Sequence, residues 1–145
     1  MRLKSVPTVH KAESGLERRH IKGKWQEDFS FSPAVVTKGG RMIWLAGHTG
    51  QKADDDRSLA GDFDAQARQT FRNLAKTLAE AGGRLEDVVT MTVFLIDARN
   101  TRQMTDIRKE IMKRDFAASA AITVAGFADP DMMIEIQAVA VVADR

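Results

Sequence analysis

Glu135 is the residue of this sequence whose position most suggests chemistry. It is the one carboxylate in an otherwise apolar stretch from Met132 to Val142. A charged group is costly in such a strand unless it is paired or reaches solvent, so two interpretations stay open. Glu135 either lies on the outward face of an alternating strand, or it serves a functional site as an acid or base.

His48 and Arg99 are two further polar residues that stand where predicted strands end. His48 follows a strand from Arg41 to Gly47, and it is either a hydrogen-bonding loop residue or a group that borders a site. Arg99 follows a strand from Val88 to Ile96, and it is either an exposed partner of Asp97 or a cation in a pocket. Neither residue alone identifies a reaction.

The sequence offers no recognisable set of metal ligands. Its three histidines, His10, His20 and His48, are scattered, and there is no cysteine. The run Asp54-Asp55-Asp56 lacks the alternation and the glycine of a calcium-binding loop. We therefore expect neither a metal nor a cofactor.

One helix and one strand, adjacent in the sequence, are the clearest elements that could position these groups. Apolar residues recur at helical spacing, at Phe63, Ala67, Phe71, Leu74 and Leu78. Asp62 or Asp64 can cap the start of this helix, and Gly82-Gly83 can end it. The residues from Val88 to Ile96 are β-branched or aromatic on both alternating faces, which predicts a central strand covered on both sides.

The segment before this helix is predicted from turn signals and alternation. Gly39-Gly40 indicates a hairpin between strands at Ala34 to Val36 and at Arg41 to Gly47. The residues from Thr49 to Gly61 read as a solvated loop. A weaker alternation from Ile21 to Phe31 favours an added edge strand.

The segment after the central strand predicts a second helix and two closing strands. Asn100 or Thr101 can cap a helix whose apolar stripe is Met104, Ile107 and Ile111, with Arg108, Lys109 and Glu110 outside that stripe. The closing strands run from Ala120 to Phe127 and from Met132 to Val142, joined by a turn at Asp129-Pro130-Asp131. The resulting order β-β-α-β-α-β-β predicts an α+β fold with one layer of helices on a mixed sheet.

Apolar residues on both faces of the predicted sheet indicate self-association. Met42, Trp44 and Ala46 alternate with Ile43 and Leu45, so apolar side chains point in both directions from this strand. Helices on one side cannot cover both faces. We therefore expect an oligomer that buries the second face.

Composition restricts the class of protein. A chain of 145 residues is one domain, which we place at residues 21–145 after a basic arm at residues 1–20. A net charge of +2 from 22 cationic and 20 anionic side chains, interspersed along the chain, gives no signature of nucleic-acid binding. The charged N-terminus has no apolar core of a signal peptide, and no later stretch could span a bilayer, so we expect a cytoplasmic protein without membrane contact.

Three segments of the sequence resemble one known family. They are AQARQTFRNLAKTLAEAGGRLEDVVTMTVFLID, the stretch PAVVTKGGRMIWLAGHTGQ from Pro33 to Gln51, and the end from Ala117 to Val142 with Ile134-Glu135-Ile136. In this order and at these separations they are similar to the Rid family, also called YjgF or L-PSP. The resemblance implies a chorismate-mutase-like fold and a homotrimer whose sheets form a central barrel. It also implies a ligand cleft at each subunit interface, where Rid enzymes hydrolyse small enamines and imines to a carbonyl compound and ammonia.

The resemblance also assigns site positions. The acidic residue that holds or activates water falls on Glu135, and the glycine that faces the substrate falls on Gly47. His48 is the next polar group at the border of the cleft. The arginine that binds the substrate carboxylate is absent, since Ser119 stands at its position, and Arg99 replaces a pocket asparagine and is the candidate for a new cation.

Two more positions depart from the family pattern, since Ala34 replaces the pocket tyrosine and Ala46 replaces a serine. The first functional hypothesis is therefore a divergent enamine or imine deaminase, a hydrolase acting on small carboxylates. The alternative is a non-catalytic trimer that binds small molecules or regulates. RNA cleavage or translation inhibition ranks last.

Overall fold

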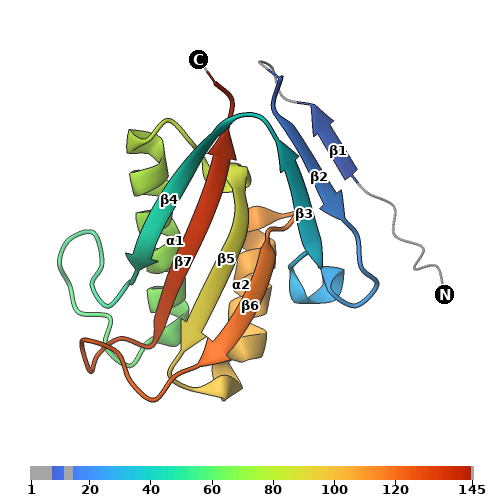
Figure 1. Ribbon diagram of the computed structural model, residues 1–145. Coiled ribbons are helices and arrows are strands. Elements are labelled where there is room, and N and C mark those ends of the chain that lie inside the picture. Colours follow the sequence, from blue (N-terminus) through green and yellow to red (C-terminus); the bar gives the residue numbers. More distant parts are fainter. Residues whose placement is uncertain (1–7, 12–14, 145) are drawn as a thin grey trace.

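The computed structural model describes residues 8–11 and 15–144 as two β-sheets and two helices (Figure 1). The strands are β1 Thr8–Lys11, β2 Glu17–Ile21, β3 Ala34–Lys38, β4 Arg41–His48, β5 Val88–Leu95, β6 Ala118–Thr123 and β7 Ile134–Val142. The helices are α1 Phe63–Glu80 and α2 Thr101–Met112, and three short 3₁₀ turns are η2 Glu27–Phe29, η3 Leu85–Asp87 and η4 Ala98–Asn100.

The larger sheet has four strands in the order β4-β7-β5-β6. β5 pairs antiparallel with β7 and parallel with β6, so the strand predicted to be central lies inside the sheet. Both helices lie behind this sheet in Figure 1, on the same face. The predicted α+β architecture, with helices on a mixed sheet, is confirmed.

The ends of α1 follow the predicted caps. Asp62 is the N-cap, and its Oδ1 accepts a hydrogen bond of 3.0 Å from the Ala65 amide. At the other end Gly82 has a φ of +86°, and the Gly83 amide donates to the Leu78 carbonyl at 2.7 Å. Local residue types therefore determine where this helix begins and ends.

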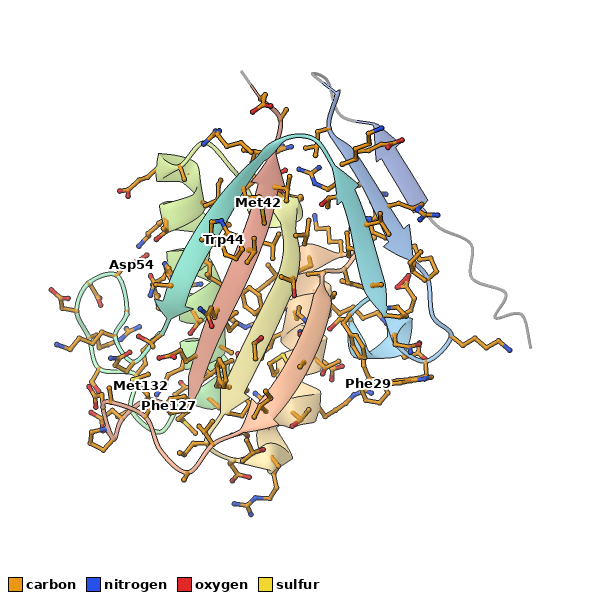
Figure 2. The ribbon with its side chains drawn as sticks, in the orientation of Figure 1. Phe29, Met42, Trp44, Asp54, Phe127 and Met132 are labelled. Atoms are coloured by element: carbon orange, nitrogen blue, oxygen red, sulfur yellow. The ribbon has the colours of Figure 1, made fainter. Side chains whose placement is uncertain are left out.

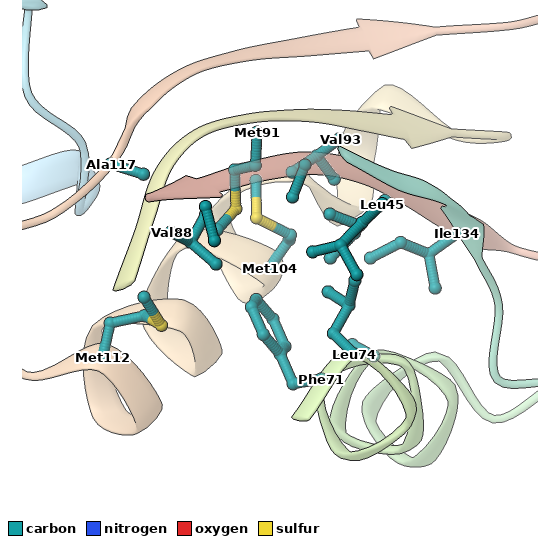
Figure 3. Close-up of a cluster of buried hydrophobic side chains, with 14 of the residues drawn as sticks. Leu45, Phe71, Leu74, Val88, Met91, Val93, Met104, Met112, Ala117 and Ile134 are labelled. Atoms are coloured by element: carbon teal, nitrogen blue, oxygen red, sulfur yellow. The ribbon is translucent and has the colours of Figure 1, made fainter. Parts of the chain in front are cut away.

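The main core lies between the helices and one face of the four-stranded sheet (Figure 3). Met91, Val93 and Leu95 of β5 point to this face and are at most 2% exposed. Phe71 and Leu74 of α1 pack against them. The predicted periodicity of both elements corresponds to this packing.

The predicted hairpin between residues 34 and 47 is wrong. Gly39 and Gly40 do form a turn, with φ values of +74° and +81°, but β3 pairs with β2, and β4 pairs with β7. A Cβ added to Gly40 would lie 2.7 Å from the Val142 carbonyl oxygen, so this turn presses against the end of β7. Turn residues indicate a change of direction, whereas the partner of each strand is chosen by packing far away in sequence.

Regular structure also begins earlier than predicted. β1 and β2 lie in the segment expected to be an arm, and together with β3 they form a three-stranded antiparallel sheet. The edge strand predicted for residues 21–31 is replaced by the end of β2 and by η2. Residues 1–7 and 12–14 of the predicted arm lie outside the described residues.

The two closing strands are separated by β5 rather than paired with each other. β6 begins at Ala118, two residues before the predicted start, and its first residue bridges to Ser32 beside β3. β7 ends at Val142 as predicted. Because β6 runs parallel to β5, the connection from β6 to β7 has to cross the end of β5.

The second face of the four-stranded sheet is open and partly apolar. Trp44 is 73% exposed and Met42 is 51% exposed, while Ile43 and Leu45 of the same strand are buried. Figure 2 shows Met42 and Trp44 over β4, on the face nearer to the viewer and opposite the helices. A shallow hollow of about 540 Å³ lies on this face, lined in part by Trp44, Thr92 and Val139. None of the helices in the described residues has the length and apolar character needed to cross a membrane.

We predict that Phe71→Ala lowers the free energy of unfolding by about 3–5 kcal/mol, because Phe71 is 1% exposed at the centre of the core. Urea unfolding followed by circular dichroism measures this change. Glu80→Ala, an exposed substitution on the same helix, should stay within about 0.5 kcal/mol of the parent. Equal effects of the two substitutions would contradict the assigned packing of α1.

Candidate functional site

Glu135 and Gly47 are brought together by the pairing of β7 with β4. The register of this pair shifts between Leu45 and His48, which marks a bulge at Ala46 and Gly47. A Cβ added to Gly47 would lie 2.7 Å from Oε2 of Glu135, so the carboxylate rests almost directly on the glycine backbone. A side chain at position 47 would occupy the space of the carboxylate, so Glu135 would have to move away.

The carboxylate of Glu135 lies on the open face of the sheet. Glu135 is opposite Phe94 of β5, and the next strand in this row carries Ile122. Neighbouring residues Ile134 and Ile136 point to the core and are fully buried. In the part of the chain that the structure describes, no hydrogen bond or ion pair engages this carboxylate, so it is available to water or to a ligand.

His48 turns toward α1 instead of toward Glu135. Its Nδ1 is 2.7 Å from the Ala46 carbonyl oxygen, and its Nε2 is 2.8 Å from Oγ1 of Thr77. Because a carbonyl oxygen only accepts, Nδ1 carries the proton in the neutral ring and Nε2 accepts from the threonine hydroxyl. His48 thus ties the end of β4 to α1.

Arg99 lies in η4 and pairs with Asp97, two residues before it. Its Nη2 is 2.7 Å from Oδ2 of Asp97, and its side chain is 91% exposed. Hydrogen bonds from Arg99 hold the pKa of the Asp97 carboxyl below its ordinary value. Among the described residues, this guanidinium contacts none of the other candidate site residues.

Ser119 lies on the opposite face of the sheet from Glu135. It is level with Met91 in the β5–β6 pair, and Met91 points into the core. Its Oγ accepts a hydrogen bond of 2.8 Å from Nη1 of Arg108, on α2. Since β5 also separates the two strands, Ser119 and Glu135 do not share one site within a single protomer.

Arg108 is the residue that the sequence pattern placed wrongly. It was expected outside the apolar stripe of the second helix, but it is only 3% exposed. Burial lowers the pKa of its guanidinium to about 10, which still leaves it charged at neutral pH. One signal could have found it: Met104, Arg108 and Met112 are spaced by four, and such residues follow one line along a helix.

A metal site is not formed by these residues. Among residues 8–11 and 15–144, no three or more histidine, cysteine, aspartate or glutamate side chains are grouped so that they could hold an ion. The arrangement instead offers an unpaired carboxylate on one face and a buried cation behind a serine on the other.

The chain is similar in sequence to known proteins of one family. Residues 26–142 match the model of the family described as endoribonuclease L-PSP. The chain is 32% identical over 111 residues to the human 2-iminobutanoate/2-iminopropanoate deaminase, a match that covers 77% of this chain and 79% of that protein. It is 30% identical over 110 residues to a RutC family protein of Pyrococcus abyssi, covering 76% of this chain and 84% of that protein.

The chain also resembles solved structures of proteins from this family. A Rid family protein of unknown function from Yersinia pestis, YyfB, has a TM-score of 0.77 and 28% identity, covering 86% of this chain and 98% of that chain. Rv2704 from Mycobacterium tuberculosis, of the YjgF/YER057c/UK114 family, has a TM-score of 0.62 and 26% identity, covering 86% of this chain and 99% of that chain.

We predict that Gly47→Ala costs about 0.5–1.5 kcal/mol of stability, because the added methyl group forces the Glu135 side chain out of its present position. In a Glu135→Ala background most of this cost should disappear, and urea unfolding of the four proteins in this double-mutant cycle measures the coupling. Gly126→Ala is the control, since a Cβ there meets nothing within 4 Å. Additive effects at positions 47 and 135 would show that the two residues do not touch.

Proposed function

The chain belongs to the endoribonuclease L-PSP family, also called Rid or YjgF, and from this premise we propose that it acts on small imines or enamines that carry a carboxylate. The reaction is hydrolysis of the C=N bond to a carbonyl compound and ammonia. The observation that carries the proposal is the unpaired carboxylate of Glu135, held against the Gly47 backbone. A relative named for imine deamination at 32% identity supports this substrate class.

Glu135 supplies the acid–base chemistry in this proposal. Water adds to the carbon of the protonated imine while the carboxylate takes one proton of the water, and the product is a neutral carbinolamine. The carboxylic acid then returns this proton to the nitrogen, and the carboxylate takes the proton of the carbinol hydroxyl as the C–N bond breaks. The carbonyl forms, and ammonia leaves with the proton that the imine carried. A carboxylate without a protein partner suits this role, because no ion pair has to break before it accepts a proton.

Three protomers around a common axis form the assembly that we propose. The open face with Trp44 and Met42 is partly apolar, and burying its apolar part in an assembly removes the free-energy cost of exposing that surface to water. Ser119 and Glu135 lie on different strands and opposite faces, so a cleft that uses both has to combine residues of two protomers. An intersubunit cleft meets both requirements.

A non-catalytic binder of small carboxylates is the second candidate. It is favoured by Ser119, which replaces the arginine of the family, and by Arg99, which is engaged with Asp97 on the surface. RNA cleavage ranks below both. The 22 cationic and 20 anionic side chains are interspersed along the chain, which gives no signature of nucleic-acid binding.

We predict that the protein sediments as a homotrimer at micromolar concentration, and that Trp44→Glu shifts it toward monomer. A carboxylate at position 44 would be buried without a partner in the assembly. Analytical ultracentrifugation measures both proteins, and Glu80→Gln serves as an exposed control that keeps the trimer. A parent protein that sediments as a stable monomer would contradict the assembly.

We further predict weak turnover of 2-aminoacrylate-type imines. A missing bidentate contact to the carboxylate costs about 1.5–3 kcal/mol, or roughly ten- to a hundredfold in rate, relative to relatives that keep the arginine. A coupled assay that scavenges the imine measures this rate. Glu135→Gln should remove the remaining activity, while Glu80→Gln should not change it; activity of Glu135→Gln equal to that of the parent would exclude Glu135 as the acid–base residue.

A further inference from the structure

Arg108 is a buried cation whose hydrogen-bond partners are all neutral. Its Nε donates to Oγ of Ser30 at 3.0 Å, its Nη2 to the Phe29 carbonyl at 2.9 Å, and its Nη1 to Oγ of Ser119 at 2.8 Å. None of the ion pairs formed by the described residues includes it. The positive charge therefore lies inside the protein without a counter-charge.

A charge in this position is unfavourable for folding alone. Met104 and Met112 lie one turn before and after Arg108 on the same line of α2, and both are buried. An apolar residue at position 108 would extend the buried stripe of Met104 and Met112, and no charge would have to be transferred out of water. Placement of a guanidinium here is explained if the charge serves a ligand.

The two serines that contact Arg108 differ in one respect. Ser30 is fully buried, and its hydroxyl both accepts from Arg108 and donates to the Thr105 carbonyl at 2.8 Å. Ser119 accepts from Arg108 in the same way, but among the described residues nothing accepts the proton of its hydroxyl. Ser119 is also partly exposed. The guanidinium occupies one of its two lone pairs, which leaves its O–H free to donate to water or to a ligand.

We propose that Arg108 and Ser119 form an anion-recognition pair, in which the Ser119 hydroxyl donates to a ligand carboxylate and the buried guanidinium supplies the positive charge behind it. Arg108 acts as a positioning residue, because it fixes the direction of the Ser119 proton without touching the ligand. The pair rests on the proposed function, and it assigns the carboxylate end of the substrate to β6.

The hydrogen bond from Arg108 to Ser119 makes the Ser119 hydroxyl a better donor to an anion. A serine that accepts from a cation is a stronger donor than an isolated serine, because each hydrogen bond in the chain polarises the next. The guanidinium also lies in a poorly screened environment, so its attraction for an anion is larger than that of an exposed arginine. An arginine at position 119 would bind the carboxylate directly with two hydrogen bonds. Ser119 backed by Arg108 offers one hydrogen bond and a more distant charge, which is a weaker contact.

Titration of 2-oxobutyrate into the full-length protein, followed by calorimetry at constant ionic strength, tests the pair. Ser119→Ala should weaken binding about tenfold or more, since it removes a hydrogen bond to a charged group. Ser119→Thr should restore affinity, because it keeps the hydroxyl. Arg108→Met should weaken binding as much as Ser119→Ala, and the double variant Arg108→Met/Ser119→Ala should be no weaker than Arg108→Met alone.

Ser30→Ala is the matched control, since it removes an equivalent hydrogen bond from Arg108 without reaching the ligand. It should change affinity by less than about threefold. Equal losses for Ser30→Ala and Ser119→Ala would mean that Arg108 merely clamps the fold, and the pair would be wrong. Where Arg108→Met does not fold, the comparison of Ser119→Ala, Ser119→Thr and Ser30→Ala decides.

The outcomes separate this inference from the proposed function. If the parent binds 2-oxobutyrate or hydrolyses imines and Ser119→Ala behaves identically, the pair is wrong and the proposed function stands. If the parent neither binds the keto acid nor hydrolyses an imine, both are wrong.

Discussion

One-sided packing of the four-stranded sheet is the constraint on which the other features depend. Met91, Val93 and Leu95 of β5 face the helices and are buried, while the alternate residues face a surface that no described element covers. Alternation along each strand then divides the polar residues between two environments. Glu135 falls on the open face and Ser119 on the helix side, so both the assembly that we propose and the separation of the two candidate residues follow from the same geometry.

The parts of the fold that were predictable are those that local residue types determine. The boundaries of α1 follow from Asp62 and Gly82, and β5 follows from an uninterrupted run of β-branched and aromatic residues. The pairing of β3 was not predictable in this way. Its register with β2 depends on contacts between segments that the sequence pattern treated as separate, and a two-glycine turn fits either a hairpin or a departure into another sheet.

The candidate site was likewise only partly predictable from the sequence. Glu135 and Gly47 were identified by residue type and family resemblance, and the pairing of β4 with β7 places them in contact. Arg108 was not identified, because helical periodicity treats every arginine as a surface residue. Its hydrogen bonds are made with Ser30, 78 residues away in sequence, and with Ser119 on strand β6. The spacing of Met104, Arg108 and Met112 is a local signal for the burial of Arg108, but nothing local indicates which residues it contacts.

The three hydrogen bonds of Arg108 also join three parts of the chain through one side chain. They connect α2 to β6 through Ser119 and to the segment around η2 through Phe29 and Ser30. A change in the position of this guanidinium alters the geometry of all three hydrogen bonds. In the anion-recognition pair that we propose, ligand binding at Ser119 and the stability of the η2 segment are therefore thermodynamically linked, and by reciprocity a partner that fixes η2 would alter the affinity at Ser119 to the same degree.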